Sequence, residues 1–217
     1  MATVLNDIEV RVLGSLVEKQ VTTPEYYPLT INAVMLACNQ KNNRNPVTAY
    51  SEEQVAEAVE SLRERNLTYV FYGSTSRVPK YKHVMPEVLH LSQPQLSLMC
   101  VLMLRGSQTL GELRERASRL HEFSSLEEVE ATLNSLISRE PEPLVVRLPR
   151  QAGQKEVRFT HLLAGEVTVE TAIEEQPQRR TSAQTDRLSS LQEDVTALKA
   201  QMEELRVQFE NFKKQFE

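Results

Sequence analysis

The chain has 217 residues, enough for one large domain or two small domains with an appendage. Its 25 basic and 30 acidic residues give a formal net charge of −5, which excludes a general attraction for nucleic acid or anionic lipid, so any basic surface must be local. Apolar runs fall short of the roughly 20 residues that cross a bilayer, and the N-terminus lacks the core of a signal peptide, so we expect a soluble, cytoplasmic protein with no membrane partner.

The first part of the chain predicts three helices followed by two strands. Apolar residues at helical spacing begin after Asn6, an N-cap candidate with Glu9 three residues later, the spacing of a capping box. Residues 30–39 predict a second helix, and Ser51 is the expected cap of a third. The segments LTYVFY and PKYKHV around the turn-forming GSTSR then indicate a β-hairpin.

The same elements recur further along the chain. The segment LNDIEVRVLGSLVEKQVTT aligns without a gap with LSQPQLSLMCVLMLRGSQT, TINAVMLAC with TLGELRERA, SEEQVAEAVESL with SLEEVEATLNSL, and YKH with FTH. Because these blocks keep their order, we infer two copies of one domain, residues 1–86 and 87–166. Three helices and a hairpin are the outline of a winged helix. The first helix of the second copy, LSLMCVLMLR, is apolar almost all round, so we expect it to pack between the copies.

Residues beyond the second copy differ in character. Residues 167–187 are polar and predict a flexible linker. Residues 188–217 carry apolar side chains at alternating spacings of three and four, the seam of a coiled coil: Leu188, Leu191, Val195, Leu198, Met202, Leu205, Phe209, Phe212 and Phe216. This pattern favours a homo-oligomer, and the alternative is a helix that folds back onto its own globular part. The predicted fold class is therefore mainly α with small β-hairpins (α+β), as two tandem winged-helix domains plus a C-terminal coiled-coil helix.

A family resemblance rests on the asparagine-rich segment CNQKNNRNPV (residues 38–47), with the preceding YYPLTINAVMLA and the later SRVPKYKH. In these segments the chain resembles the YceH-like family of uncharacterised bacterial proteins, over about residues 5–165. The resemblance implies a tandem winged-helix fold, in agreement with the internal repeat, and implies no established activity.

The residue types that usually carry catalysis are not arranged for it here. The four histidines lack the spacing of metal ligands, and His83 and His161 occupy equivalent positions in the two copies, which favours a packing role. Cys38 and Cys100 lie among apolar residues at helical spacing and are expected to be buried thiols. A glycine loop that could cradle phosphate is also missing. We therefore expect a non-enzymatic protein with no catalytic residues, metal or cofactor.

The third helix of the first copy carries the wrong charge for reading DNA. In a winged helix that binds DNA, this helix enters the major groove with basic or amide side chains. Here a spacing of four, three and four places four acidic residues on its outward face: Glu53, Glu57, Glu60 and Glu64. This acidic face would repel phosphate, and it is a candidate surface for a protein partner.

Basic residues gather instead in the two hairpins and the asparagine-rich loop. The candidates for contact with nucleic acid are Lys41, Arg44, Arg77, Lys80, Lys82, Arg147, Arg150, Lys155 and Arg158. Tyr50, Tyr69 and Tyr72 are expected in the core rather than as platforms for stacking bases. Two functions remain open: a DNA-binding or transcription-regulatory module that contacts phosphate through its hairpins, or an adaptor that binds an unidentified protein through the acidic face.

Overall fold

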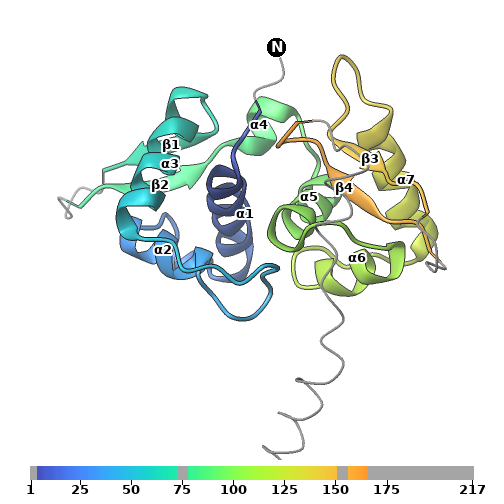
Figure 1. Ribbon diagram of the computed structural model, residues 1–217, viewed down its shortest axis with the longest axis horizontal. Helices are drawn as coiled ribbons and strands as arrows, with labels where there is room; N and C mark the ends of the chain where they lie inside the picture. Colours follow the sequence, from blue (N-terminus) through green and yellow to red (C-terminus); the bar gives the residue numbers. More distant parts are fainter. Residues whose placement is uncertain (1–3, 73–77, 151–155, 166–217) are drawn as a thin grey trace, which may run out of the picture. The chain divides into compact units, whose positions relative to one another are not determined.

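The computed structural model describes residues 4–72, 78–150 and 156–165, and Figure 1 shows the arrangement of their elements. These residues are mainly helical with two small antiparallel sheets of two strands each, which confirms the predicted mainly α class with β-hairpins. In this part of the chain, no helix has both the length and the apolar character that crossing a membrane requires. The predicted linker (167–187) and coiled coil (188–217) lie outside the described residues.

The predicted order of elements occurs twice (Figure 1). The first copy consists of α1 (Asp7–Thr22), the short 3₁₀ helix η1 (Pro24–Tyr26), α2 (Ile31–Cys38), α3 (Glu52–Glu64), β1 (Thr68–Phe71) and β2 (Lys80–His83). A short helix, α4 (Met85–Leu89), leads to the second copy. The second copy consists of α5 (Gln93–Arg105), α6 (Leu110–Ala117), α7 (Leu126–Ile137), β3 (Val145–Arg147) and β4 (Phe159–His161).

Side-chain caps determine where the helices begin. The Asn6 side chain accepts the Glu9 N–H at 2.9 Å and the Asn6 N–H donates back to the Glu9 carboxylate at 2.7 Å, so the predicted capping box of α1 is confirmed. Ser51 forms a second capping box at the start of α3. Thr30 and Thr109, which are equivalent in the two copies, cap α2 and α6. Each cap satisfies amide groups that a first helical turn leaves unpaired, which is worth about 1 kcal/mol.

Each hairpin gains one further pairing from the residue just before the cap of the second helix. Leu29 and Tyr81 exchange backbone hydrogen bonds of 3.1 and 2.7 Å. Gln108 and Phe159 exchange bonds of 3.0 and 2.8 Å at the equivalent place in the second copy. This added pairing ties the hairpin of each copy to the start of its second helix, and it extends the internal repeat from the sequence to the backbone contacts.

The two copies meet through their first helices, α1 and α5, which lie side by side (Figure 1). Gly14 of α1 permits the close approach, because a Cβ atom at this position would lie only 3.0 Å from Leu104 Cδ2 and from Met103 Cβ. The thiol of Cys100, the residue equivalent to Gly14, donates to the Gly14 carbonyl at 3.4 Å. Equivalent residues of the two copies therefore touch at the centre of this contact.

Helix α5 is covered on several sides, as its apolar circumference predicts. It packs against α1 of the first copy and against α6, α7 and β4 of the second. Buried apolar residues of both copies form one continuous core. The predicted division of the chain at residue 86 stays a prediction, since this core runs through both copies.

Candidate nucleic-acid interface

The solvent face of the first hairpin combines aromatic and basic side chains. Alternate residues of β1 point outward, which leaves Tyr69 59% and Phe71 44% exposed. The strand register places Tyr69 opposite Lys82 and Phe71 opposite Lys80, so all four side chains share one side of the sheet. The Lys82 ammonium lies 5.6 Å from the centre of the Tyr69 ring, within reach of a cation–π interaction. These four residues are called the hairpin face below.

Two tyrosines near this hairpin lie on the surface, contrary to the prediction from the sequence. Tyr69 and Tyr72 were expected in the core, but they are 59% and 70% exposed, so that expectation is wrong for both. Tyr50 is half-buried and packs against the core. Thr68 explains the difference, because its buried hydroxyl donates to the Val59 carbonyl at 3.1 Å, which orients β1 so that its alternate residues face solvent.

Arg44, a predicted phosphate contact, is instead an interior residue. Its side chain has no exposed surface, and its Nη2 atom lies 2.6 Å from the Glu18 carboxylate. Its remaining donors bind the carbonyls of Ala37 and Asn43 at 2.8 to 3.0 Å. The prediction that Arg44 meets phosphate is therefore wrong, because every polar group that it offers already has a partner inside the protein. Lys41, in the same loop, is exposed.

The asparagine-rich segment holds the two copies together. The Arg11 guanidinium donates to the Pro46 carbonyl at 2.8 Å, which anchors the segment on α1. The Asn45 N–H donates to the carbonyl of Leu104 at 2.9 Å, which anchors it on the last turn of α5. Loop amides and buried guanidinium groups thus satisfy backbone carbonyls that would otherwise lack partners. These contacts give the segment a structural role at the junction of the two copies.

The second hairpin offers fewer available charges. Arg147 and Arg150 are exposed. Arg158 is half-buried, and its Nη1 atom donates to the Ser107 carbonyl at 2.8 Å and to the Glu112 carboxylate at 3.1 Å. The charge of Arg158 is therefore largely compensated within the protein.

The basic candidates do not form one continuous surface in the described residues. Arg77 and Lys155 lie outside those residues. Of the described candidates, Lys80 and Lys82 are the pair that the strand register brings together with exposed aromatic rings. The alternation of side chains along β1 and its pairing with β2 produce this face, whereas the sequence predicted its tyrosine, Tyr69, to lie in the core.

The acidic face of α3 lies on the surface. Glu53, Glu57, Glu60 and Glu64 are all exposed, whereas the apolar positions of the helix are buried in the core. Glu60 forms an ion pair with Arg63 on the same surface. Three of the four carboxylates have no ion pair among the described residues, so α3 presents a net negative surface to solvent.

The remaining groups that could carry chemistry are buried. Burial lowers the pKa of His83 to about 4, and its Nε2 atom lies 2.6 Å from the Gln20 side-chain oxygen. Burial also raises the pKa of the Cys38 and Cys100 thiols, both of which are free. Within the described ranges, no group of three or more His, Cys, Asp or Glu side chains could hold a metal ion.

Comparison with known proteins gives a consistent set of relatives. A family described as "Protein of unknown function, DUF480" matches residues 5–154. A UPF0502 protein of Opitutus terrae is 51% identical over 89% of this chain and 83% of its own length. UPF0502 proteins of Geobacter sulfurreducens (47% identical, 90% of each chain) and Vibrio atlanticus (43% identical, 91% of this chain and 93% of the relative) are also similar. The chain therefore belongs to the DUF480/UPF0502 family of bacterial proteins of unknown function, as the resemblance of its sequence predicted.

Proposed function

We propose that this protein is a non-enzymatic, tandem winged-helix module that binds DNA through its first hairpin. The hairpin face carries the proposal, because it sets Tyr69 beside Lys82 and Phe71 beside Lys80 on a solvent-exposed surface. The repeated order of three helices and a hairpin, with a third pairing before the second helix, supports the winged-helix assignment.

The chemistry of the hairpin face suits a nucleic-acid backbone with accessible bases. Lysine ammonium groups attract phosphates, and exposed aromatic rings offer surfaces on which unpaired bases or sugars can stack. Neither kind of contact reads base edges, so binding should be weak, strongly dependent on salt and only slightly dependent on sequence.

The acidic face of α3 constrains how DNA approaches. Its carboxylates would repel phosphates if α3 entered the major groove, as the third helix of many winged helices does. We infer that DNA contacts the hairpin and that α3 points away from it. Arg147 and Arg150 of the second hairpin are exposed and are available for further phosphate contacts.

The same acidic face favours a second candidate function, an adaptor for a protein partner. Four exposed carboxylates on one helix could dock a basic surface of that partner. In either case we infer that the protein works in the cytoplasm, as a homo-oligomer formed through residues 188–217.

The salt dependence of DNA binding tests the first proposal. Fluorescence anisotropy would follow binding of labelled single-stranded and duplex oligonucleotides to the full-length protein over a range of salt concentrations. We expect the double variant K80Q/K82Q to bind more weakly and to reduce the slope of log Kd against log salt by about two on duplex DNA. Lys19→Gln, at the last turn of α1, is the matched control and should leave the slope unchanged. Unchanged binding in K80Q/K82Q would refute the hairpin as the contact surface.

A further inference from the structure

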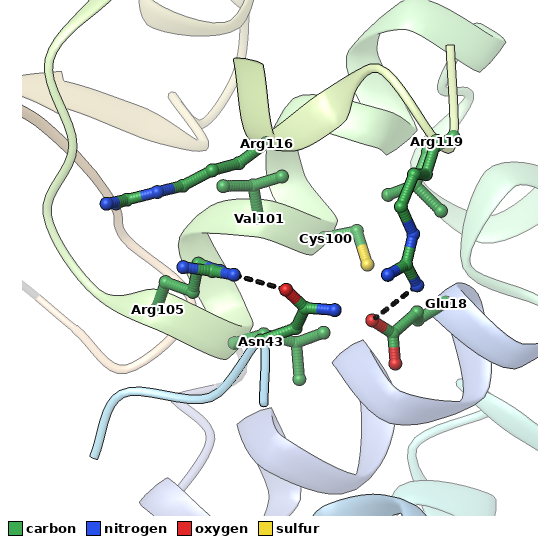
Figure 2. A pocket seen from close by; sticks show the side chains of 9 residues that line it. Glu18, Asn43, Cys100, Val101, Arg105, Arg116 and Arg119 are labelled. Carbon is green, nitrogen blue, oxygen red and sulfur yellow. Dashed lines mark hydrogen bonds and ion pairs between the residues drawn. The ribbon is translucent and has the colours of Figure 1, made fainter. Parts of the chain in front are cut away.

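A small cavity of about 30 Å³ lies where the two copies meet. Figure 2 shows the side chains around it, which come from α1, the asparagine-rich segment, α5 and α6 with the turn after it. Its polar lining consists of Glu18, Asn43, Cys100, Arg105, Arg116 and Arg119. Three arginine residues thus line a space that holds only a few atoms.

The arginines at this cavity are incompletely compensated. Arg105 donates to the Asn43 side-chain oxygen and forms no ion pair within the described part of the chain. Arg119 approaches the Glu18 carboxylate only at 3.9 Å, and its side chain is 58% exposed. Glu18 itself is held much more closely by the buried Arg44, at 2.6 Å. The negative charge of Glu18, which lines the cavity, is therefore already compensated by the buried Arg44.

The remaining arginine adds to the positive field. Arg116 pairs with Glu112 at 3.4 Å, and Glu112 is shared with Arg158 at 3.1 Å. Burial, followed by the charge of Arg116, lowers the pKa of Arg105, as expected for a cation held among other cations. The positive charges around the cavity therefore exceed the negative ones, which favours the binding of an anion.

We propose that this cavity binds the phosphate group of a small molecule. Figure 2 shows Arg105 and Asn43 on one side of the cavity and Arg119 and Glu18 on the other, with the Arg116 side chain directed away from Arg119. A phosphate between Arg105 and Arg119 would accept hydrogen bonds from two guanidinium groups, the donors that match its geometry best. The ion pair of Glu18 with the buried Arg44 reduces the repulsion between the Glu18 carboxylate and such a phosphate.

A phosphate in the cavity would contact residues of both copies. Asn43 and Glu18 belong to the first copy, and Arg105 and Arg119 belong to the second. A ligand that binds only the folded protein raises its free energy of unfolding by RT ln(1 + [L]/Kd), where [L] is the free ligand concentration. Phosphate binding would thus be visible as a stabilisation of the whole folded unit, and this proposal does not depend on DNA binding.

Thermal unfolding and calorimetric titration of the full-length protein test the site, with inorganic phosphate and adenosine monophosphate as probes and sodium chloride of equal ionic strength as the reference. We expect Tm to rise with the logarithm of the phosphate concentration above Kd, which chloride does not cause, and we expect the calorimetric titration to saturate. Arg119→Gln should raise the Kd about tenfold or more, the usual effect of losing one charge-assisted hydrogen bond. Arg63→Gln, an exposed arginine on the surface of α3, is the matched control and should bind phosphate like the wild type.

Arg105→Gln is expected to reduce binding further, although it also removes the contact with Asn43 and therefore the support of the loop. If Arg105→Gln fails to fold, Arg119→Gln still tests the site. The Arg119 side chain is 58% exposed, so its replacement should not disturb folding. Tighter binding of adenosine monophosphate than of phosphate would support a phosphomonoester as the ligand, and equal binding would support free phosphate. A rise in Tm no larger than that with chloride, or wild-type affinity in Arg119→Gln, would overturn the proposal. No DNA is present, so this result is independent of the hairpin face.

Discussion

His83 and His161 occupy the last residue of the second strand in each copy. The His83 N–H donates to the Tyr27 hydroxyl at 2.8 Å, and the ring contacts Gln20. Burial lowers the pKa of both histidines to about 4, compared with about 6.5 in an unfolded chain. Between these two pH values, the unfolded chain takes up protons that the folded protein excludes. The contribution of these two histidines to the free energy of unfolding should therefore be complete above about pH 6.5. It should be lost progressively as the pH falls towards 4.

The variant His83→Gln tests this dependence, because glutamine does not titrate. Between pH 7 and 4.5 the free energy of unfolding of the variant should fall by about 2 kcal/mol less than that of the wild type, since His83 no longer contributes. Urea unfolding followed by circular dichroism at several pH values measures the difference. His90→Asn is the control, since His90 is exposed and has a φ of 47°, where asparagine is tolerated. Parallel pH curves for His83→Gln and the wild type would contradict this interpretation.

Single residues differ in how far the sequence could predict their roles. Equivalent positions in a repeat predicted that His83 and His161 serve in packing. Arg44 could not be predicted in the same way, because its partner Glu18 lies 26 residues away and only the tertiary fold brings the two together. Tyr69 was misplaced because a short half-buried strand has two faces, and apolar character alone does not say which one is covered.

At the scale of elements, α3 separates the two candidate functions. If DNA binds the hairpin face, replacing Glu57 and Glu60 by glutamine should leave affinity unchanged or increase it, because these carboxylates only repel phosphate. Anisotropy with labelled DNA at low salt measures this effect, and K80Q/K82Q is the contrasting variant. Loss of capture of a protein partner in E57Q/E60Q, together with no DNA binding at low salt, would instead favour the adaptor.

Helices and hairpins could be predicted closely because their signals are local. Caps such as Asn6 and Ser51 mark the beginning of a helix within a few residues, and the repeat supplied an independent check. The additional pairings of Leu29 and Gln108 could not be predicted, since a single paired residue has no periodicity. The cavity between the copies was missed for a related reason. Its arginines come from α5, from α6 and from the turn after α6, and no motif in the sequence joins them.

At the scale of the whole molecule, residues 188–217 predict self-association. Removing residues 187–217 should convert a dimer or higher oligomer into a monomer, because the apolar seam is predicted to pair with the same seam of another copy. Sedimentation at tens of micromolar measures the change. Leu198→Glu places a charge in the seam and should have the same effect, whereas Thr196→Glu, beside the seam, should not. A full-length protein that sediments as a monomer would refute the prediction.

The meeting of Gly14 with Cys100 has a consequence for symmetry. These are equivalent residues, so the two copies contact each other through the same surface, as the subunits of a twofold dimer do. An interface of this kind is closed: once α1 and α5 have paired, neither copy has that surface left for a third. A third copy could therefore not join through this surface, unlike the repeats of a solenoid, each of which contacts its neighbours. Either copy alone would expose the apolar helix face that the other copy covers.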